Sequence, residues 1–297
     1  MKISVIGAGN VGASAASAIM LRKIADEIAL VDIFGNVALA KAMDLAQSAA
    51  VFDIDVKISG GDDFSLIKDS DIVVVTAGSP RKEGQSREDL LLKNAQIVKS
   101  TVEKIAKFAP NCIIINVTNP LDILTFVTYK VSGFDKSRIL GMAGELDSAR
   151  LKFEISKRLN LQNSQIKAHV MGAHNDDMLV LKDNINVTLS DDEFEEISND
   201  TKTGGAKFVK LLGTSAYYAP GAAAAKMCEA IKDESDEWLS CCVVVDDGLT
   251  CGRRVKLNKN GIAKIKDPSQ EEKEALVKSE NDIRKNINFL IESSVLS

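Results

Sequence analysis

The chain opens with two short apolar runs on either side of an amphipathic stretch. Residues 3–6 are apolar, rich in β-branched side chains and too short for a helix, so they predict a buried strand. Residues 13–24 carry apolar side chains at helical spacing, and a second apolar run at residues 28–31 ends on Asp32. The pattern predicts a strand, a helix and a second strand, which together form a βαβ unit.

This alternation continues through the first half of the chain. Residues 91–105 place apolar side chains on one helical face, and Asn119-Pro120 predicts a helix with proline at its first position. Further apolar runs, typical of buried strands, occur at residues 56–59, 72–76 and 112–117, with a final short strand at 139–141. Strands separated by helices indicate a mostly parallel, doubly wound sheet with helices on both faces.

The pattern changes in the second half. A helix is expected from near Ser148, and a long charged helix from Ser269. Between them, strands at 239–245 and 255–265 flank turn residues, which gives them antiparallel character. The expected fold class is α/β, with a Rossmann-type doubly wound parallel sheet over residues 1–142 and a smaller α+β catalytic domain over residues 143–297.

A glycine-rich turn follows the first strand. Gly7 permits a tight turn, Gly9 lets the backbone approach a pyrophosphate, and Gly12 lets helix and strand pack closely. The helix N-terminus then offers unpaired N–H groups to phosphates. Asp32 lies about twenty residues further on, where a carboxylate binds a ribose diol and repels a 2′-phosphate, which favours NAD over NADP. The alternatives are an ordinary βαβ unit with a glycine turn and a site for S-adenosylmethionine.

Composition excludes several classes of protein. The chain has 297 residues, 45% of them hydrophobic and 27% charged, as in soluble globular proteins. Its formal charge of −5 argues against nucleic acid as a partner, and no apolar run is long enough to cross a membrane. Met1-Lys2 leads directly into the first strand, so we expect no signal peptide and a cytoplasmic protein. The 5 cysteines are irregularly spaced, which predicts neither disulfides nor a metal site, and Cys112, Cys241 and Cys242 are expected in the core.

The loop at residues 79–87 leaves the carboxyl end of a predicted parallel strand, where open α/β sheets bind ligands. It carries Arg81 and Arg87 and ends in a possible helix cap at Ser86. A mobile lid with two arginines would suit closure over an anion. An ordinary solvated surface loop remains the alternative.

Three further residues have side chains suited to catalysis. Asp147 and Arg150 lie three positions apart, hence on one helical face, either as part of a site or as a local ion pair. The chain has 2 histidines. His174 follows a predicted strand end and has a pKa suited to proton exchange with a hydroxyl. His169 lies within the strand and is expected to be packed or exposed there.

Taken together, these motifs resemble those of the NAD-dependent lactate/malate dehydrogenase family over nearly the whole chain. The matching stretches are residues 7–12, Asp32, 76–78, 81–87, 117–120, 146–150, 172–174 and 213–218. The resemblance implies NAD as cofactor, a reversible hydride transfer to or from a small 2-hydroxy acid, and a place in the tricarboxylic acid cycle. It also implies a homodimer or homotetramer.

The resemblance assigns roles residue by residue. His174 would exchange the proton, Asp147 would orient the ring, and Arg87 would polarise the substrate carbonyl after loop closure. Arg150 would bind the substrate carboxylate, and Asn119 the reacting oxygen. The residues implied to bind the cofactor are Gly7, Gly9, Asn10, Val11, Gly12, Asp32, Thr76, Ala77, Gly78, Asn94, Val117 and Asn119.

The substrate class rests on Arg81. At the matching position the lactate-specific members of the family carry glutamine, and the malate-specific members carry arginine. A second cation matches the second carboxylate of malate or oxaloacetate and would be left unpaired by pyruvate, at a cost of several kcal/mol. The resemblance therefore implies a dicarboxylate substrate and the malate-oxidising members of the lactate-dehydrogenase-like branch. Lactate oxidation is the nearest alternative.

One stretch departs from the family pattern. Asn175-Asp176-Asp177 follows the histidine, where the family usually has Gly-Asp-Ser or Gly-Asp-Thr. Asn tolerates a left-handed backbone, so the turn is expected to survive. Asp177 adds negative charge near an anion site, which would raise the pKa of His174 or weaken substrate binding. A nucleotide-binding regulator with little turnover is therefore a further alternative.

Overall fold

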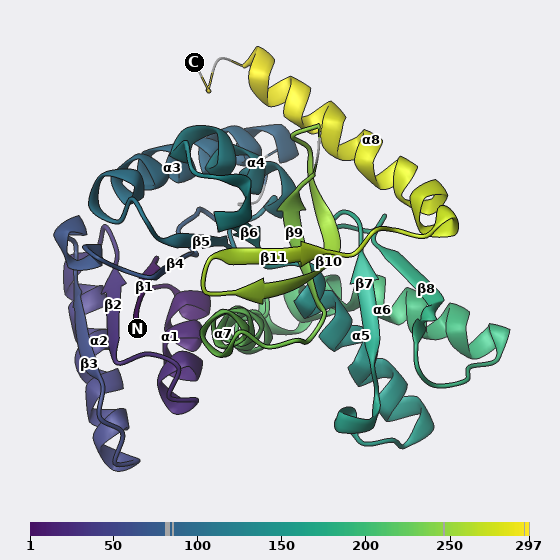
Figure 1. The fold of residues 1–297 in the computed structure, drawn as a ribbon, viewed down its shortest axis with the longest axis horizontal. Coiled ribbons are helices and arrows are strands. Elements are labelled where there is room, and N and C mark those ends of the chain that lie inside the picture. Colours follow the sequence, from purple (N-terminus) through teal and green to yellow (C-terminus); the bar gives the residue numbers. More distant parts are fainter. Residues whose placement is uncertain (81–83, 85, 246, 294, 297) are drawn as a thin grey trace.

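The computed structural model describes residues 1–80, 84, 86–245, 247–293 and 295–296. Within them, one 9-stranded sheet has the order β11-β10-β9-β6-β5-β4-β1-β2-β3 (Figure 1). Its strands are β1 (Lys2–Ile6), β2 (Glu27–Val31), β3 (Lys57–Gly61), β4 (Ile72–Val75), β5 (Ile113–Asn116), β6 (Ile139–Gly141), β9 (Leu239–Val244), β10 (Thr250–Asn258) and β11 (Gly261–Ile265). A separate pair comprises β7 (Ala168–Met171) and β8 (Leu179–Ile185).

The six strands from β1 to β6 are parallel, as predicted. In the register, Ile6 stands opposite both Val31 and Val75. The carboxyl ends of β1, β2 and β4 therefore lie at one edge of the sheet. This edge is where a doubly wound sheet binds ligands.

The strand at residues 139–141 is not the last of this sheet, contrary to expectation. Leu140 pairs with Val243 of β9, which runs antiparallel to β6, and β10 and β11 extend the sheet further. Every residue of β9 is buried. A strand whose side chains are buried on both faces lies inside a sheet and has a neighbouring strand along each edge. For β9 these neighbours are β6, from the first half of the chain, and β10.

The helices cover both faces of the sheet (Figure 1). Helices α1 (Asn10–Leu21), α2 (Gly35–Val51) and α7 (Tyr218–Asp233) pack into one apolar cluster, and α3 (Arg87–Phe108), α4 (Leu121–Ser132) and α8 (Gln270–Glu292) into another. Helices α5 (Gly144–Leu159) and α6 (Asp191–Leu212) pack with the β7–β8 pair around a third cluster. This arrangement confirms the predicted α/β class.

Four helix boundaries compare directly with their sequence signals. Ser86 caps α3 through a reciprocal capping box, and Ser269 caps α8 in the same way, as expected. Pro120, the predicted first helical residue, is instead the N-cap of α4, so the helix begins one position later than predicted, at Leu121. Helix α5 begins at Gly144, earlier than the expected start near Ser148.

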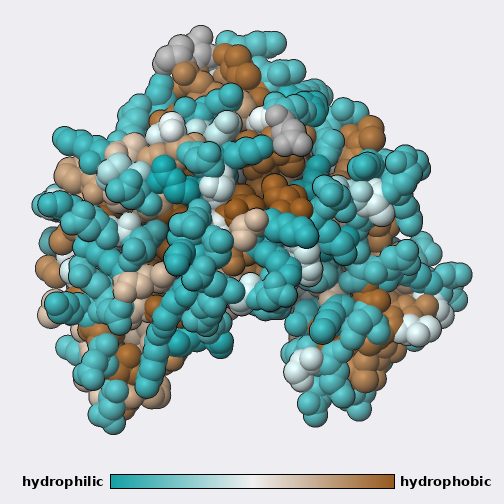
Figure 2. All heavy atoms as spheres, in the orientation of Figure 1, coloured by the Kyte–Doolittle hydropathy of each residue, from teal (hydrophilic) through white to brown (hydrophobic). Residues whose placement is uncertain are grey.

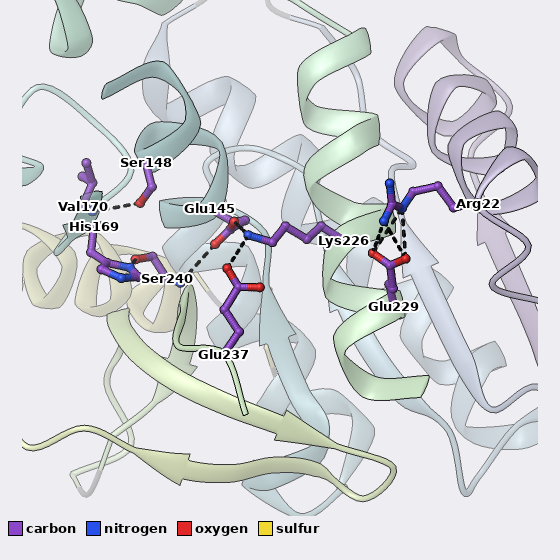
Figure 3. Close-up of polar contacts among 9 residues, drawn as sticks. All are labelled: Arg22, Glu145, Ser148, His169, Val170, Lys226, Glu229, Glu237 and Ser240. Carbon is purple, nitrogen blue, oxygen red and sulfur yellow. Dashed lines mark hydrogen bonds and ion pairs between the residues drawn. The ribbon is translucent and has the colours of Figure 1, made fainter. Parts of the chain in front are cut away.

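Helix α7 ties the second half of the chain to the first (Figure 3). Glu229 accepts two pairs of hydrogen bonds from the guanidinium of Arg22, at 2.7 to 3.1 Å. Lys226 donates to Glu145 of α5 at 2.7 Å and to Glu237 at 3.0 Å. Charged contacts therefore hold α7 both to α1 and to the helix that carries Asp147.

The surface in the orientation of Figure 2 is largely hydrophilic, with apolar atoms gathered in patches between charged side chains. Among the described residues, no helix combines the length and apolar character needed to cross a membrane.

Candidate active site

The glycine turn between β1 and α1 forms one wall of a cavity of about 760 Å³. Gly7 has φ +106°, which favours glycine, and a Cβ on Gly12 would lie 1.9 Å from the carbonyl oxygen of Gly7. A Cβ on Gly9 would meet no atom within 4 Å. The turn is therefore tight where the helix packs and open where Gly9 borders the cavity.

Asp32 lines the same cavity at the carboxyl end of β2. Its Oδ2 accepts a hydrogen bond from the backbone N–H of Ala8 at 2.6 Å, and its Oδ1 accepts one from Phe34 N–H at 2.9 Å. These two bonds fix the carboxylate at the cavity wall. Each oxygen retains a lone pair for a ribose hydroxyl. A cavity of this size, walled by the glycine turn and by a fixed carboxylate, fits a dinucleotide.

Thr76, Ala77 and Gly78 line this cleft beside the glycine turn. The Thr76 hydroxyl donates to the carbonyl of Gly7 at 3.0 Å, so it supports the turn. Asn94 is buried and does not line this cleft. Its Oδ1 accepts from Ser79 N–H at 2.8 Å and its Nδ2 donates to the carbonyl of Asn119 at 2.8 Å.

A second cavity, of about 330 Å³, contains the groups expected to do chemistry. Val11, Val117 and Asn119 line it from the first half of the chain, and Arg150 and His174 from the second. Asn10 is exposed at the start of α1 and lines neither this cavity nor the dinucleotide cleft. The sheet edge and α5 thus bring together residues that are far apart in sequence.

Asp147 holds two of the second-half side chains that line this cavity, those of His174 and Arg150. Its Oδ2 lies 2.7 Å from Nδ1 of His174, and its Oδ1 accepts from Arg150 at 3.0 Å. The residue is 1% exposed. Asp147 and Arg150 lie on one face of α5, as their spacing predicts.

The environment of His174 favours its protonated form. Burial lowers the pKa of the imidazole, but the charges of Asp147 and Asp122 and the hydrogen bond to Asp147 outweigh burial, and the pKa lies above its ordinary value. The positive charge of Arg150 opposes them only in part. The ring can therefore hold and release a proton near neutral pH.

The predicted lid lies partly outside the described residues. Arg81 is not among them. Arg87 is the first residue of α3 and is exposed, and it is absent from the described lining of the second cavity. Arg87 is therefore not brought to His174 in this structure.

The stretch after His174 is held differently from what its sequence indicates. A turn forms here, as expected, but Asn175 is not among the described residues with positive φ, so the turn does not use a left-handed backbone. Its Oδ1 instead accepts from Asp177 N–H at 2.8 Å, forming an Asx turn. Asp177 accepts from Lys278 of α8 at 2.6 Å. Asp176, rather than Asp177, lines the cavity.

Two further charged groups near the site were not predicted from the sequence. Lys202 of α6 lines the second cavity, and lysine in a charged helix gives no signal because it usually faces solvent. Asp122 of α4 contacts the His174 backbone at 2.7 Å. An acid in a helix's first turn is ordinarily explained by the helix dipole.

His169 and the cysteines expected in the core lie where the sequence predicts. His169 lies in β7, partly buried, and burial lowers its pKa to about 4. All 5 cysteines are free and buried, and burial raises the pKa of Cys112, Cys228 and Cys251 to about 12. Such thiols are inert core residues. The described part of the chain contains no group of acidic, histidine or cysteine side chains that could hold a metal ion.

Comparison with known proteins matches both halves of the chain. Residues 1–141 match the family model of the lactate/malate dehydrogenase NAD-binding domain, and residues 144–293 that of the lactate/malate dehydrogenase alpha/beta C-terminal domain. The malate dehydrogenase of Chlorobium limicola is 41% identical over 98% of both chains.

Solved structures give the same result. The apo malate dehydrogenase of Picrophilus torridus has a TM-score of 0.94 at 37% identity, covering 98% of this chain and 97% of that one. The malate dehydrogenase of Archaeoglobus fulgidus, solved with NADH, has a TM-score of 0.89 at 36% identity, covering 98% and 99%. The chain belongs to the lactate/malate dehydrogenase family.

Proposed function

We propose that the chain is an NAD-dependent malate dehydrogenase that interconverts (S)-malate and oxaloacetate. The observation that carries this proposal is the double contact of Asp147, at 2.7 Å to the His174 ring and 3.0 Å to Arg150. It couples a proton-exchanging group to an anion-binding group in one cavity. Malate dehydrogenase relatives with about the same length and fold support the choice of reaction.

His174 exchanges the proton with the substrate oxygen. During malate oxidation the neutral ring takes the hydroxyl proton, and Asp147 stabilises the imidazolium that results. During oxaloacetate reduction the protonated ring returns it. The glycine turn and Asp32 would hold NAD, which would accept the hydride from C2 of malate when bound.

Arg150 binds the substrate's C1 carboxylate, for which a guanidinium offers a planar pair of N–H donors. Its contact with Asp147 sets its direction. Asn119, at the cavity wall, donates to the reacting oxygen. Substrate is thereby oriented between the histidine and the cofactor cleft.

Arg81 and Arg87 act after loop closure. Arg87 polarises the carbonyl, and Arg81 pairs with the second carboxylate, which selects a dicarboxylate over pyruvate. Lys202 of α6 adds a further cation to this cavity. Asn94 acts by holding Asn119 in place. Asn10, which lines neither cavity, is assigned to the cofactor by the family resemblance alone.

A second copy of the chain covers part of the surface. Helix α2 exposes several large apolar side chains outside the dinucleotide cleft: Leu39, Met43 and Val51. Apolar side chains gathered on one exposed helix favour a homodimer or homotetramer in solution. The cytoplasm and the tricarboxylic acid cycle are the expected setting, with residues 1–142 as the NAD domain and 143–297 as the catalytic domain.

The test is steady-state NADH oxidation with oxaloacetate and pyruvate, using the native chain and His174→Asn. Rapid oxaloacetate turnover that is lost in the variant, with NADH affinity kept, is the expected result. NADH binding without turnover of either acid by the native chain would instead identify a nucleotide-binding regulator. Preferred turnover of pyruvate would identify a lactate dehydrogenase.

A further inference from the structure

A buried carboxyl group lies directly behind the catalytic histidine. Asp122 is in the first turn of α4 and is 4% exposed. Its Oδ2 accepts a hydrogen bond from the backbone N–H of His174 at 2.7 Å. Its Oδ1 has no hydrogen-bond partner within the described ranges. The proton exchange proposed above makes no use of this group.

The neighbouring backbone N–H is held in a similar way from another helix. Ala173 N–H donates to the hydroxyl of Ser279 of α8 at 2.5 Å, and Ser279 is 1% exposed. Two successive N–H groups of the strand end are therefore held by side chains, one from α4 and one from α8. Both N–H groups lie beyond the end of β7, and their hydrogen bonds are to side chains rather than to a neighbouring strand.

The position of Asp122 links it to the substrate side of the cavity. It follows Asn119 and Pro120 at the start of α4, and Asn119 lines the cavity that His174 also lines. One short segment therefore carries both the proposed donor to the reacting oxygen and the anchor of the proton-exchanging ring. A shift of this segment would displace both groups together.

We infer that Asp122 is a positioning residue, which sets the backbone of His174 so that its ring meets both Asp147 and the substrate oxygen. The inference rests on the proposed role of His174. Reacting groups must be placed to within a fraction of an ångström, and a misplacement of about 1 Å can cost roughly a hundredfold in rate. A backbone anchor of this kind affects the chemical step more than binding.

The chemistry of the group supports this role over simple packing. A buried carboxylate is costly, and a hydroxyl or amide could accept one N–H with less penalty. The N-terminal turn of α4 offers a partial positive charge that offsets part of the cost. Burial raises the pKa of Asp122, which the hydrogen bond from His174 opposes. Cys242 of β9 and Asp147 of α5 also face the carboxyl group.

The test compares Asp122→Ala, which removes the acceptor, with Asp122→Asn, which keeps one. The expected result for Asp122→Ala is a kcat for oxaloacetate reduction roughly ten- to hundredfold lower, with the KM for oxaloacetate and the NADH affinity within about twofold of native. Asp122→Asn is expected to recover most of kcat, because its amide oxygen can still accept the His174 N–H. Thr128→Val, another buried polar change in α4, whose hydroxyl bonds only the helix carbonyl of Leu124, serves as the control and leaves kcat unchanged.

A native-like kcat in Asp122→Ala, or an Asp122→Asn as impaired as Asp122→Ala, would overturn the inference. If Asp122→Ala does not fold, Asp122→Glu takes its place, since one added methylene displaces the acceptor while keeping the charge. A lower kcat with unchanged NADH affinity supports the inference, and an unchanged kcat overturns it.

A readout independent of turnover separates this inference from the proposed function. The low-field NMR signal of the His174 ring proton bound to Asp147, identified by its loss in His174→Asn, should weaken in Asp122→Ala and persist in Asp122→Asn. If the native chain shows this signal but turns over no oxaloacetate, the proposed function fails while the positioning role stands. A signal unchanged in Asp122→Ala overturns the positioning role.

Discussion

Asp147 Oδ2 lies 2.7 Å from Nδ1 of His174, and both side chains are largely withdrawn from solvent. A carboxylate at this distance favours the charged imidazolium, and the pKa of His174 is raised although burial alone would lower it. In the proposed mechanism the other ring nitrogen, Nε2, exchanges the proton with the substrate. This relationship gives the site its pH dependence.

Oxaloacetate reduction should be fast below the raised pKa of His174 and fall as pH rises through it, because reduction needs the protonated ring. Malate oxidation should rise over the same range. The same shift adds stability to the fold below the ordinary histidine pKa, and this contribution is lost as pH rises through the raised pKa. Rate profiles of both directions against pH check this prediction, and coincident, flat profiles would contradict it.

Asp147→Asn should lower the pKa of His174 and move the decline of oxaloacetate reduction to lower pH. The kcat should fall by about a hundredfold, the usual scale of general acid–base catalysis. Steady-state kinetics across pH measure both effects. NADH affinity serves as the control, because Asp147 does not line the dinucleotide cleft. A profile displaced to higher pH would exclude the assigned role.

Arg150→Gln should raise the KM for oxaloacetate strongly while NADH affinity stays close to native. Removing one partner of a buried charge pair costs roughly 3 to 5 kcal/mol, which corresponds to more than about a hundredfold in kcat/KM. Arg150→Lys should recover only part of the loss, because an ammonium cannot form the bidentate pair. Full recovery with lysine would argue against planar carboxylate recognition.

Asp32→Ser should weaken NADH binding by about tenfold and improve the use of NADPH, because the carboxylate that repels a 2′-phosphate is gone. Lys41 lines the same cavity and donates to the carbonyl of Ala8 at 2.6 Å. Its positive charge would favour the 2′-phosphate of NADPH. Titration with both nucleotides measures the change. Unaltered preference for NADH would remove Asp32 from the ribose site.

Gly12→Ala should destabilise the fold and abolish NADH binding, because the added Cβ would lie 1.9 Å from the carbonyl oxygen of Gly7. Overpacking of this kind costs about 1 to 3 kcal/mol. Thermal unfolding and NADH titration give the two readouts. Gly84→Ala is a useful comparison, since a Cβ there would meet no atom of the described residues within 4 Å, although its φ of +77° adds some backbone strain.

Local patterns in the sequence were sufficient to predict the parallel sheet, the glycine turn and the pairing of Asp147 with Arg150. Each depends on residues close together in the chain, where spacing fixes geometry. The contact between Asp147 and His174 was expected only from the family resemblance. Spacing alone could not show it, because the residues come from different elements, α5 and the end of β7.

What the sequence could not reveal depends on distant contacts. The pairing of β9 with β6 joins residues about a hundred positions apart, as Leu140 and Val243 do. Ser279 reaches the strand end from the C-terminal helix, and nothing in a charged amphipathic helix marks one serine as a backbone acceptor. The turn after His174 uses an Asx hydrogen bond, an option that residue preferences for φ did not distinguish.

The most direct measurement is NADH oxidation with oxaloacetate and with pyruvate, made in parallel on the native chain and on Arg81→Gln. The account predicts rapid turnover of oxaloacetate by the native chain, little turnover of pyruvate, and a marked shift towards pyruvate in the variant. Equal use of both acids by the native chain, or a native chain that binds NADH and reduces neither, would contradict it.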